Sequence, residues 1–170
     1  MKRRTLDIMF SVGGLALAGL LLVLGLVLNS NANFAKDYVH DQLAAQKITF
    51  KTADTLTDQE KQAACLVKFA GQDLVTGKQA ECYANEFIAL HMAESAKNAG
   101  YEGYTYATLG TPQSQLRTQV ADAQKANDPG LADLQAKLTA INSLRDTMFR
   151  GETLRGLLLT SFGFSVFGVK

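Results

Sequence analysis

The sequence has little of the residue types that build disulfide-rich, zinc-binding or nucleic-acid-binding proteins. It contains no Trp, and only 2 Pro, 2 Cys and 2 His among 170 residues. Two cysteines are too few for a disulfide scaffold or a zinc finger. A formal net charge of +1 gives no electrostatic basis for binding nucleic acid. The scarcity of Pro, together with the many Ala, Gln, Lys and Leu residues, favours helix over sheet and predicts an all-α protein.

A long apolar run near the N-terminus predicts a membrane anchor. Residues 8–28 carry no charge, and as a helix they would be about 31 Å long, the thickness of the hydrocarbon core. The basic residues Lys2–Arg4 come just before the run and should stay in the cytoplasm, which places the main domain on the outer side of the plasma membrane. The alternative is a cleaved signal peptide with a weak cleavage site at residues 30–32. Because the apolar region of a signal peptide is usually about 7–15 residues long, we favour the uncleaved transmembrane helix, with residues 1–7 in the cytoplasm.

Small residues recur on one face of the predicted anchor. Ser11, Gly14, Ala18 and Gly25 fall near one side of a helix, where they would let another membrane helix approach closely. This pattern predicts a docking face for a membrane partner. An equally simple explanation is that Gly and Ala are common in membrane helices.

Residues 29–151 are expected to form a helical domain outside the membrane. Signals for the beginnings and ends of helices recur along this segment. Thr57 followed by Glu60 forms a capping box for a helix that ends at Gly71, and Thr76 has the properties of an N-cap for a helix that ends at Gly100. The tyrosine-rich segment after Gly100 is expected to be a loop.

A helical hairpin is expected between residues 112 and 148. Thr111-Pro112 and Asp128-Pro129 each place Pro in the first turn of a helix. Apolar residues recur at helical spacing in both segments, namely Leu116, Val120 and Ala123 in the first and Leu131, Leu134, Leu138, Ile141 and Met148 in the second. Two such helices joined by a short turn predict an antiparallel pair.

The two cysteines lie symmetrically about a predicted turn. Cys65 precedes the turn between Gly71 and Thr76 by as many residues as Cys82 follows it, so paired antiparallel helices would bring them together. The outer side of a bacterial membrane is oxidising, which favours a disulfide over two buried free thiols.

The last segment, residues 152–170, is apolar but too short to cross a bilayer alone. Gly151 is expected to end the preceding helix. The segment is interpreted as an interfacial helix, with a core helix or the start of a second membrane helix as alternatives. Arg150 and Arg155 flank this corner and are candidates for contact with a partner or with lipid phosphate.

Four stretches carry a resemblance to a known family. They are Val39–Gln46, Gly71–Gly77, Ala80–Ile88 and Phe149–Leu159. Together they resemble a family of small actinobacterial membrane proteins that are often labelled aromatic ring-opening dioxygenases. The resemblance implies a second membrane helix after the last motif. One branch of the family is similar to an accessory subunit of the mycobacterial and corynebacterial respiratory supercomplex, which joins cytochrome bcc to the terminal oxidase.

The dioxygenase label fits the residues poorly. Such enzymes hold iron with two His and one carboxylate, so His40 and His91 would both have to serve. His91 and Glu94 have the reverse order of the Glu-x-x-His pattern of di-iron helical proteins. No motif for nucleophilic catalysis or phosphate binding is present either. We therefore expect no catalytic, cofactor-binding or metal-binding residues in this chain.

The sequence thus predicts a non-catalytic accessory subunit of a membrane complex, with the actinobacterial respiratory supercomplex as the expected assembly. Its expected partners are integral membrane subunits, such as those of cytochrome bcc or the oxidase, and membrane lipid. The alternative is a free-standing envelope protein that binds a lipid or small ligand through its outer domain. An iron enzyme is the third hypothesis and the least favoured.

Overall fold

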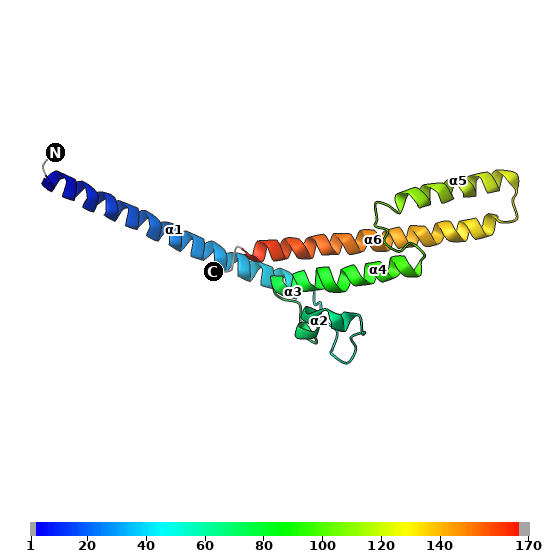
Figure 1. The fold of residues 1–170 in the computed structure, drawn as a ribbon, viewed down its shortest axis with the longest axis horizontal. Coiled ribbons are helices and arrows are strands. Elements are labelled where there is room, and N and C mark those ends of the chain that lie inside the picture. Colours follow the sequence, from blue (N-terminus) through cyan, green and yellow to red (C-terminus); the bar gives the residue numbers. More distant parts are fainter. Residues whose placement is uncertain (1–2, 167–170) are drawn as a thin grey trace.

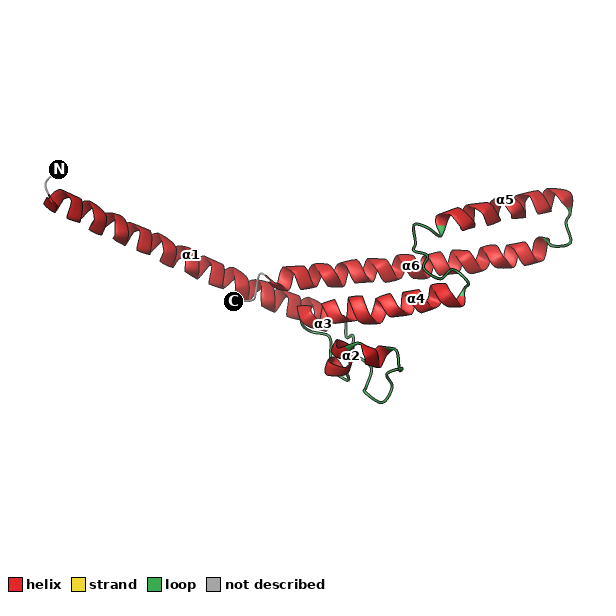
Figure 2. Ribbon diagram, in the orientation of Figure 1, coloured by secondary structure: helices red, strands yellow, loops and turns green. Residues whose placement is uncertain are grey.

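Helices make up almost all of the secondary structure in the computed structural model, which describes residues 3–166 (Figures 1 and 2). They are α1 (Arg3–Ala45), α2 (Ala64–Phe69), α3 (Gly77–Cys82), α4 (Ala89–Asn98), α5 (Gly110–Ala126) and α6 (Leu131–Val166). A 3₁₀ turn covers Glu60–Gln62, and a π-helical turn covers Tyr83–Ile88. Within residues 3–166 there is no strand, only an isolated bridge between Thr49 and Asp73. The expected all-α fold is confirmed.

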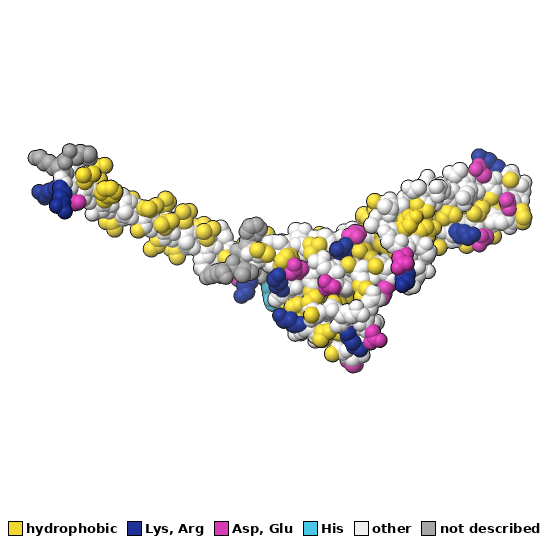
Figure 3. Space-filling model, in the orientation of Figure 1, with side chains coloured by type: hydrophobic (Ala, Val, Ile, Leu, Met, Phe, Trp, Pro, Cys, Tyr) yellow, Lys and Arg dark blue, Asp and Glu magenta, His cyan; other side chains and the backbone are white. Residues whose placement is uncertain are grey.

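Helix α1 is a continuous rod of 43 residues with two different environments. Its first part, through Leu28, is exposed and apolar, as Figure 3 shows along the extended arm. Among the described residues it is the one helix long and apolar enough to cross a membrane. Its outer part packs on the rest of the protein and buries Ala32, Ala35, Val39 and Leu43. Helix α1 therefore continues without a break past the apolar run.

Helices α3 and α4, with the π-helical turn between them, form one rod that lies along α6 (Figure 1). The rod begins at the predicted cap, where Thr76 Oγ1 accepts from the Gln79 N–H and the Gln79 side chain accepts from the Thr76 N–H. It ends before Gly100, whose φ of +79° is a left-handed conformation that favours glycine. Both predicted ends of this helix are confirmed, whereas the π-helical turn inside it was not expected.

The predicted hairpin is formed by α5 and the first half of α6 (Figure 1). Ile141 and Leu144 are buried in it, while the leucines nearer the tip are only half-buried because two helices cannot enclose a core alone. At the base of the hairpin, the Gln113 amide donates to Asn142 Oδ1 at 2.6 Å, and Arg145 donates to Gln113 Oε1. Arg145 also lies over the ring of Tyr106, which fixes the preceding loop on α6.

Helix α6 contradicts the expected break at residue 151. It runs without interruption from Leu131 to Val166, so the predicted boundary between residues 151 and 152 is not a structural one. Gly151 is instead the point where α6 meets α4. A Cβ at Gly151 would lie 2.8 Å from Met92 Cγ and would overlap the Met92 sulfur. The glycine is needed for close packing of two helices and not for ending one.

The C-terminal half of α6 runs back along the C-terminal part of α1 (Figure 1). Leu158 shares a core with Val39 and Leu43. Gly77 at the start of α3 lets α6 come close, because a Cβ there would overlap Ser165 and lie 3.2 Å from Phe162 Cα. The C-terminal end of the described chain therefore lies beside the point where α1 leaves its apolar segment.

Candidate functional site

The predicted docking residues of α1 lie on one open face of the helix. Ser11, Gly14, Ala18 and Gly25 are all exposed, and a Cβ built on either glycine meets no atom within 4 Å. The residues that would seat a partner are therefore free in the single chain. The structure places them on a common face, as expected, but nothing in it covers that face.

This open face is the continuation of the face that α1 buries against the other helices. Gly14, Leu21 and Gly25 precede Ala32, Val39 and Leu43 by 18 residues in each case, which is about five helical turns. Because α1 is a single unbroken helix, residues five turns apart point in the same direction. The small residues of the apolar segment are thus aligned with the buried residues outside it.

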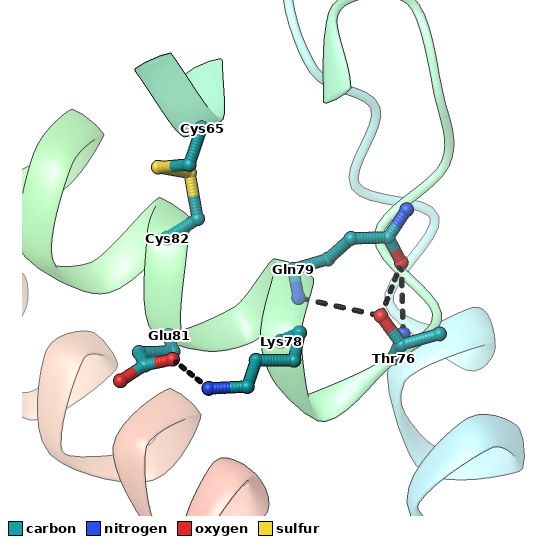
Figure 4. Close-up of a disulfide and its surroundings, with 6 residues drawn as sticks. All are labelled: Cys65, Thr76, Lys78, Gln79, Glu81 and Cys82. Carbon is teal, nitrogen blue, oxygen red and sulfur yellow. Dashed lines mark hydrogen bonds and ion pairs between the residues drawn. A yellow bond between two sulfur atoms is a disulfide. The ribbon is translucent and has the colours of Figure 1, made fainter. Parts of the chain in front are cut away.

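The cysteines form the predicted disulfide. Cys65 in α2 and Cys82 at the end of α3 have an S–S distance of 1.97 Å and a Cα–Cα distance of 6.0 Å (Figure 4). Cys82 is buried, and a salt bridge of 3.0 Å between Lys78 and Glu81 lies one turn before it on the same helix. The bridge fastens the short α2 segment to the long rod, although α2 is only six residues and not the longer helix that the sequence predicted.

The two arginines at the corner of α6 have different environments. Arg150 is exposed and pairs with Asp146 at 2.9 Å, one turn earlier on the same helix. Arg155 donates to the Ala84 carbonyl oxygen at 3.0 Å and pairs with Glu152 at 3.0 Å, so its guanidinium is used within the protein. Arg155 thereby links α6 to the π-helical turn. Because its side chain is exposed, Arg150 is the better candidate of the two for contact with a partner.

A buried ionic cluster around Glu60 was not predicted as a site. The Glu60 side chain is 0% exposed, yet its carboxylate accepts from Lys51 Nζ at 2.7 Å, the Thr57 N–H at 2.7 Å and His91 Nε2 at 3.0 Å. The other ring nitrogen of His91 lies 3.5 Å from Glu94 Oε2. Burial alone would raise the pKa of Glu60, but the bonds from Lys51, Thr57 and His91 lower it from 4.5 to about 2. The sequence identified Glu60 as a capping residue but carried no signal for its contact with His91.

A groove with a largely apolar lining lies between α1 and the C-terminal half of α6. Its volume is about 450 Å³, within the range of ligand sites. Its lining contains no charged side chain: Tyr38, Val39, Gln42, Leu43, Gln46 and Ile48 come from α1 and the segment after it, and Leu154, Leu157, Leu158, Thr160, Ser161 and Phe164 from α6. The groove could hold an apolar group.

The two histidines do not come together. His40 is exposed on α1 beside Asp41, whereas His91 belongs to the Glu60 cluster. Between residues 3 and 166, no group of three or more His, Cys, Asp or Glu side chains is arranged to hold a metal ion.

Comparison with known proteins finds no match: no family model, no curated protein and no solved structure is significantly similar to this chain. The resemblance to actinobacterial membrane proteins therefore stays an expectation from the sequence. The site has to be interpreted from its own geometry.

Proposed function

We propose that this protein is a non-catalytic accessory subunit that docks on an integral membrane protein through one face of α1. The proposal includes an anchor that crosses the plasma membrane with its N-terminus in the cytoplasm. The observation that carries it is the alignment of Gly14 and Gly25, which are open, with Ala32 and Leu43, which are buried. The face that α1 uses for packing beyond its apolar segment therefore continues along the apolar segment itself.

Close packing is the interaction that such a face supports. Lipid tails are as apolar as leucine, so hydrophobicity does not drive helices together within a bilayer, while small residues allow the close approach that does. The two glycines leave the backbone of α1 accessible at two levels of the anchor, about 16 Å apart along the helix.

A second copy of this chain is a poor occupant of the face. Its α1 would have the same direction in the membrane, and seated on Gly14 and Gly25 it would extend outward toward α6, which packs beside Val39 and Leu43. The α1 helix of the second copy and the α6 helix of the first would then overlap. The favoured occupant is therefore a helix of a different membrane protein. From the family resemblance, the cytochrome bcc–oxidase supercomplex is the proposed assembly.

Replacing Gly14 and Ala18 together by Leu tests this proposal. The leucines would hold the partner helix away while leaving membrane insertion intact, so the double variant should stay in the membrane but lose its complex. The matched control replaces Ala16 and Gly19 by Leu, because these two small residues lie on the opposite side of α1. Tagged chains would be purified in mild detergent and the copurifying haem measured by reduced-minus-oxidised spectra.

The control should retain wild-type haem, the test variant should lose it, and the haem content of the membranes should not change. If both variants retain their partner equally, the docking face is elsewhere. If wild-type protein copurifies with another membrane protein but no haem, the supercomplex assignment fails while the docking proposal stands.

The groove between α1 and α6 favours a second candidate function, a free-standing envelope protein that binds a lipid or small ligand. Its uncharged lining suits an apolar group, and its polar members Gln42, Thr160 and Ser161 could orient one. Mass spectrometry of small molecules released from purified wild-type protein, compared with a Leu157→Gln variant, would support this function if one compound is depleted in the variant.

A further inference from the structure

Three aromatic rings meet where the outer domain approaches the end of the apolar segment. The rings of Phe34 and Tyr38 stack at 5.8 Å, and the ring of Phe164 meets Tyr38 edge-on at 5.9 Å. Together these residues are named the aromatic collar. The rings stay 62%, 50% and 40% exposed, so packing against one another satisfies only part of their apolar surface. A group of large exposed rings from two helices calls for a contact outside the chain.

The position of the collar along α1 indicates what that contact is. Phe34 follows Leu28, the last residue of the apolar run, by about 9 Å along the helix axis. The headgroup layer on each side of a bilayer is roughly 5–8 Å thick. Side chains on a helix tilt toward its N-terminus, so the rings of Phe34 and Tyr38 lean toward the membrane. If α1 spans the bilayer, Phe34 lies at the outer edge of the headgroups, and Tyr38, about 6 Å further along the helix axis, leans back toward them.

The distribution of charged residues on α1 and α6 agrees with a position of the collar at the headgroups. No charged residue lies between Asp7 and Lys36 on α1, and none lies between Arg155 and Val166 on α6. The end of α6 beside α1 thus carries no charge, while Lys36 and Asp37 lie between Phe34 and Tyr38 in the sequence, at the level of the collar, where Lys36 can pair with lipid phosphate. Tyr is favoured at this depth of a membrane, and Phe is common on helix faces that enter the interface.

We propose that the aromatic collar rests on the lipid headgroups of the outer leaflet and holds the outer domain end-on to the membrane. This inference rests on the proposed membrane-spanning α1, but it adds a second contact with lipid, made by the end of α6. In this orientation α6 rises away from the bilayer along its length of about 54 Å. The hairpin of α5 and α6 is then held far above the surface, where only the extramembrane part of a partner can reach it.

The absence of Trp from the chain gives a clean test by depth-dependent fluorescence quenching. Single substitutions F34W, F164W, L157W and F149W place one fluorophore at increasing heights, and all four replace exposed side chains. Phe149 is the matched control, since it lies on the same helix but about 22 Å beyond Phe164. A fifth variant, L20W, places the fluorophore inside the apolar segment.

Each full-length variant would be reconstituted into vesicles of phosphatidylcholine and phosphatidylglycerol that contain a lipid spin-labelled on its headgroup. We expect a large loss of emission for F34W and F164W, a smaller loss for L157W and none for F149W. With a lipid spin-labelled on its acyl chain, L20W should lose most emission. Circular dichroism would confirm that each variant keeps its helical content.

Three results would overturn the inference, and they differ from one another. Equal quenching of F164W and F149W would mean that the domain lies flat on the membrane. Unquenched F34W and F164W beside a quenched L20W would mean that the domain stands clear of the lipid, while the anchor is kept. An unquenched L20W would mean that α1 does not enter the bilayer, which removes the proposed anchor as well.

Discussion

Acid should weaken this protein through one buried carboxylate, Glu60, and the substitution Glu60→Gln isolates that effect. The native state holds the Glu60 side chain out of water, and Lys51, the Thr57 N–H and His91 all stabilise its charged form. Glutamine keeps the size and one accepting oxygen but cannot be protonated in this range. The difference between wild type and variant therefore reports the titration of this group.

The size of the effect follows from the pKa of Glu60, which is lowered from 4.5 to about 2 in the folded protein. A group whose pKa is lower in the folded state stabilises it fully above the unfolded pKa and loses that contribution as the pH falls through the folded pKa. The window is thus from about pH 4.5 down to about pH 2. A shift of this size corresponds to roughly 3 kcal/mol, since one pKa unit is about 1.4 kcal/mol.

The assay is urea unfolding of the full chain in detergent, followed by tyrosine fluorescence at several pH values. The stability advantage of wild type over Glu60→Gln should be constant above pH 5 and shrink by roughly 3 kcal/mol toward pH 2. Glu94→Gln is the matched control, because Glu94 contacts the other nitrogen of His91 but is only half-buried. Parallel pH curves for wild type and Glu60→Gln would refute the proposed charge state of the buried cluster.

Three further predictions concern the framework of the chain. Unreduced peptide mapping should find Cys65 joined to Cys82, and reduction should cost about 3 kcal/mol of stability, as expected for a loop of this length; free thiols in protein purified without reductant would contradict this. Gly151→Leu should destabilise the protein by about 1–3 kcal/mol through overlap with Met92, whereas Gly156→Ala, where no atom lies within 4 Å, should be neutral or stabilising; equal effects would show that α4 and α6 do not meet at Gly151. A cysteine placed at Lys125 should react with a membrane-impermeant reagent in intact spheroplasts, and labelling only after permeabilisation would reverse the proposed topology.

Local features of this protein were predictable from the sequence because their causes are local. The apolar run is continuous in the sequence, and the caps at Thr57 and Thr76 and the Pro signals that begin the hairpin each act within one or two helical turns. The disulfide was also predictable, since Cys65 and Cys82 flank a single turn and need no knowledge of the rest of the fold. These features set where helices begin and which neighbours in sequence pack together.

Features that depend on residues distant in the sequence were decided only by the tertiary structure. Gly151 has the sequence properties of a helix end, yet it lies inside α6, where Met92 of another helix fills the space that a side chain would take. Glu60 is a helix cap by sequence and a buried ion by structure, because His91 lies 31 residues further along the chain. The alignment of the open face of α1 with its buried face likewise depends on α1 being unbroken and on α6 returning beside it. The sequence of a helix gives the period of its side-chain pattern, but only packing against other elements decides which face of the helix is covered.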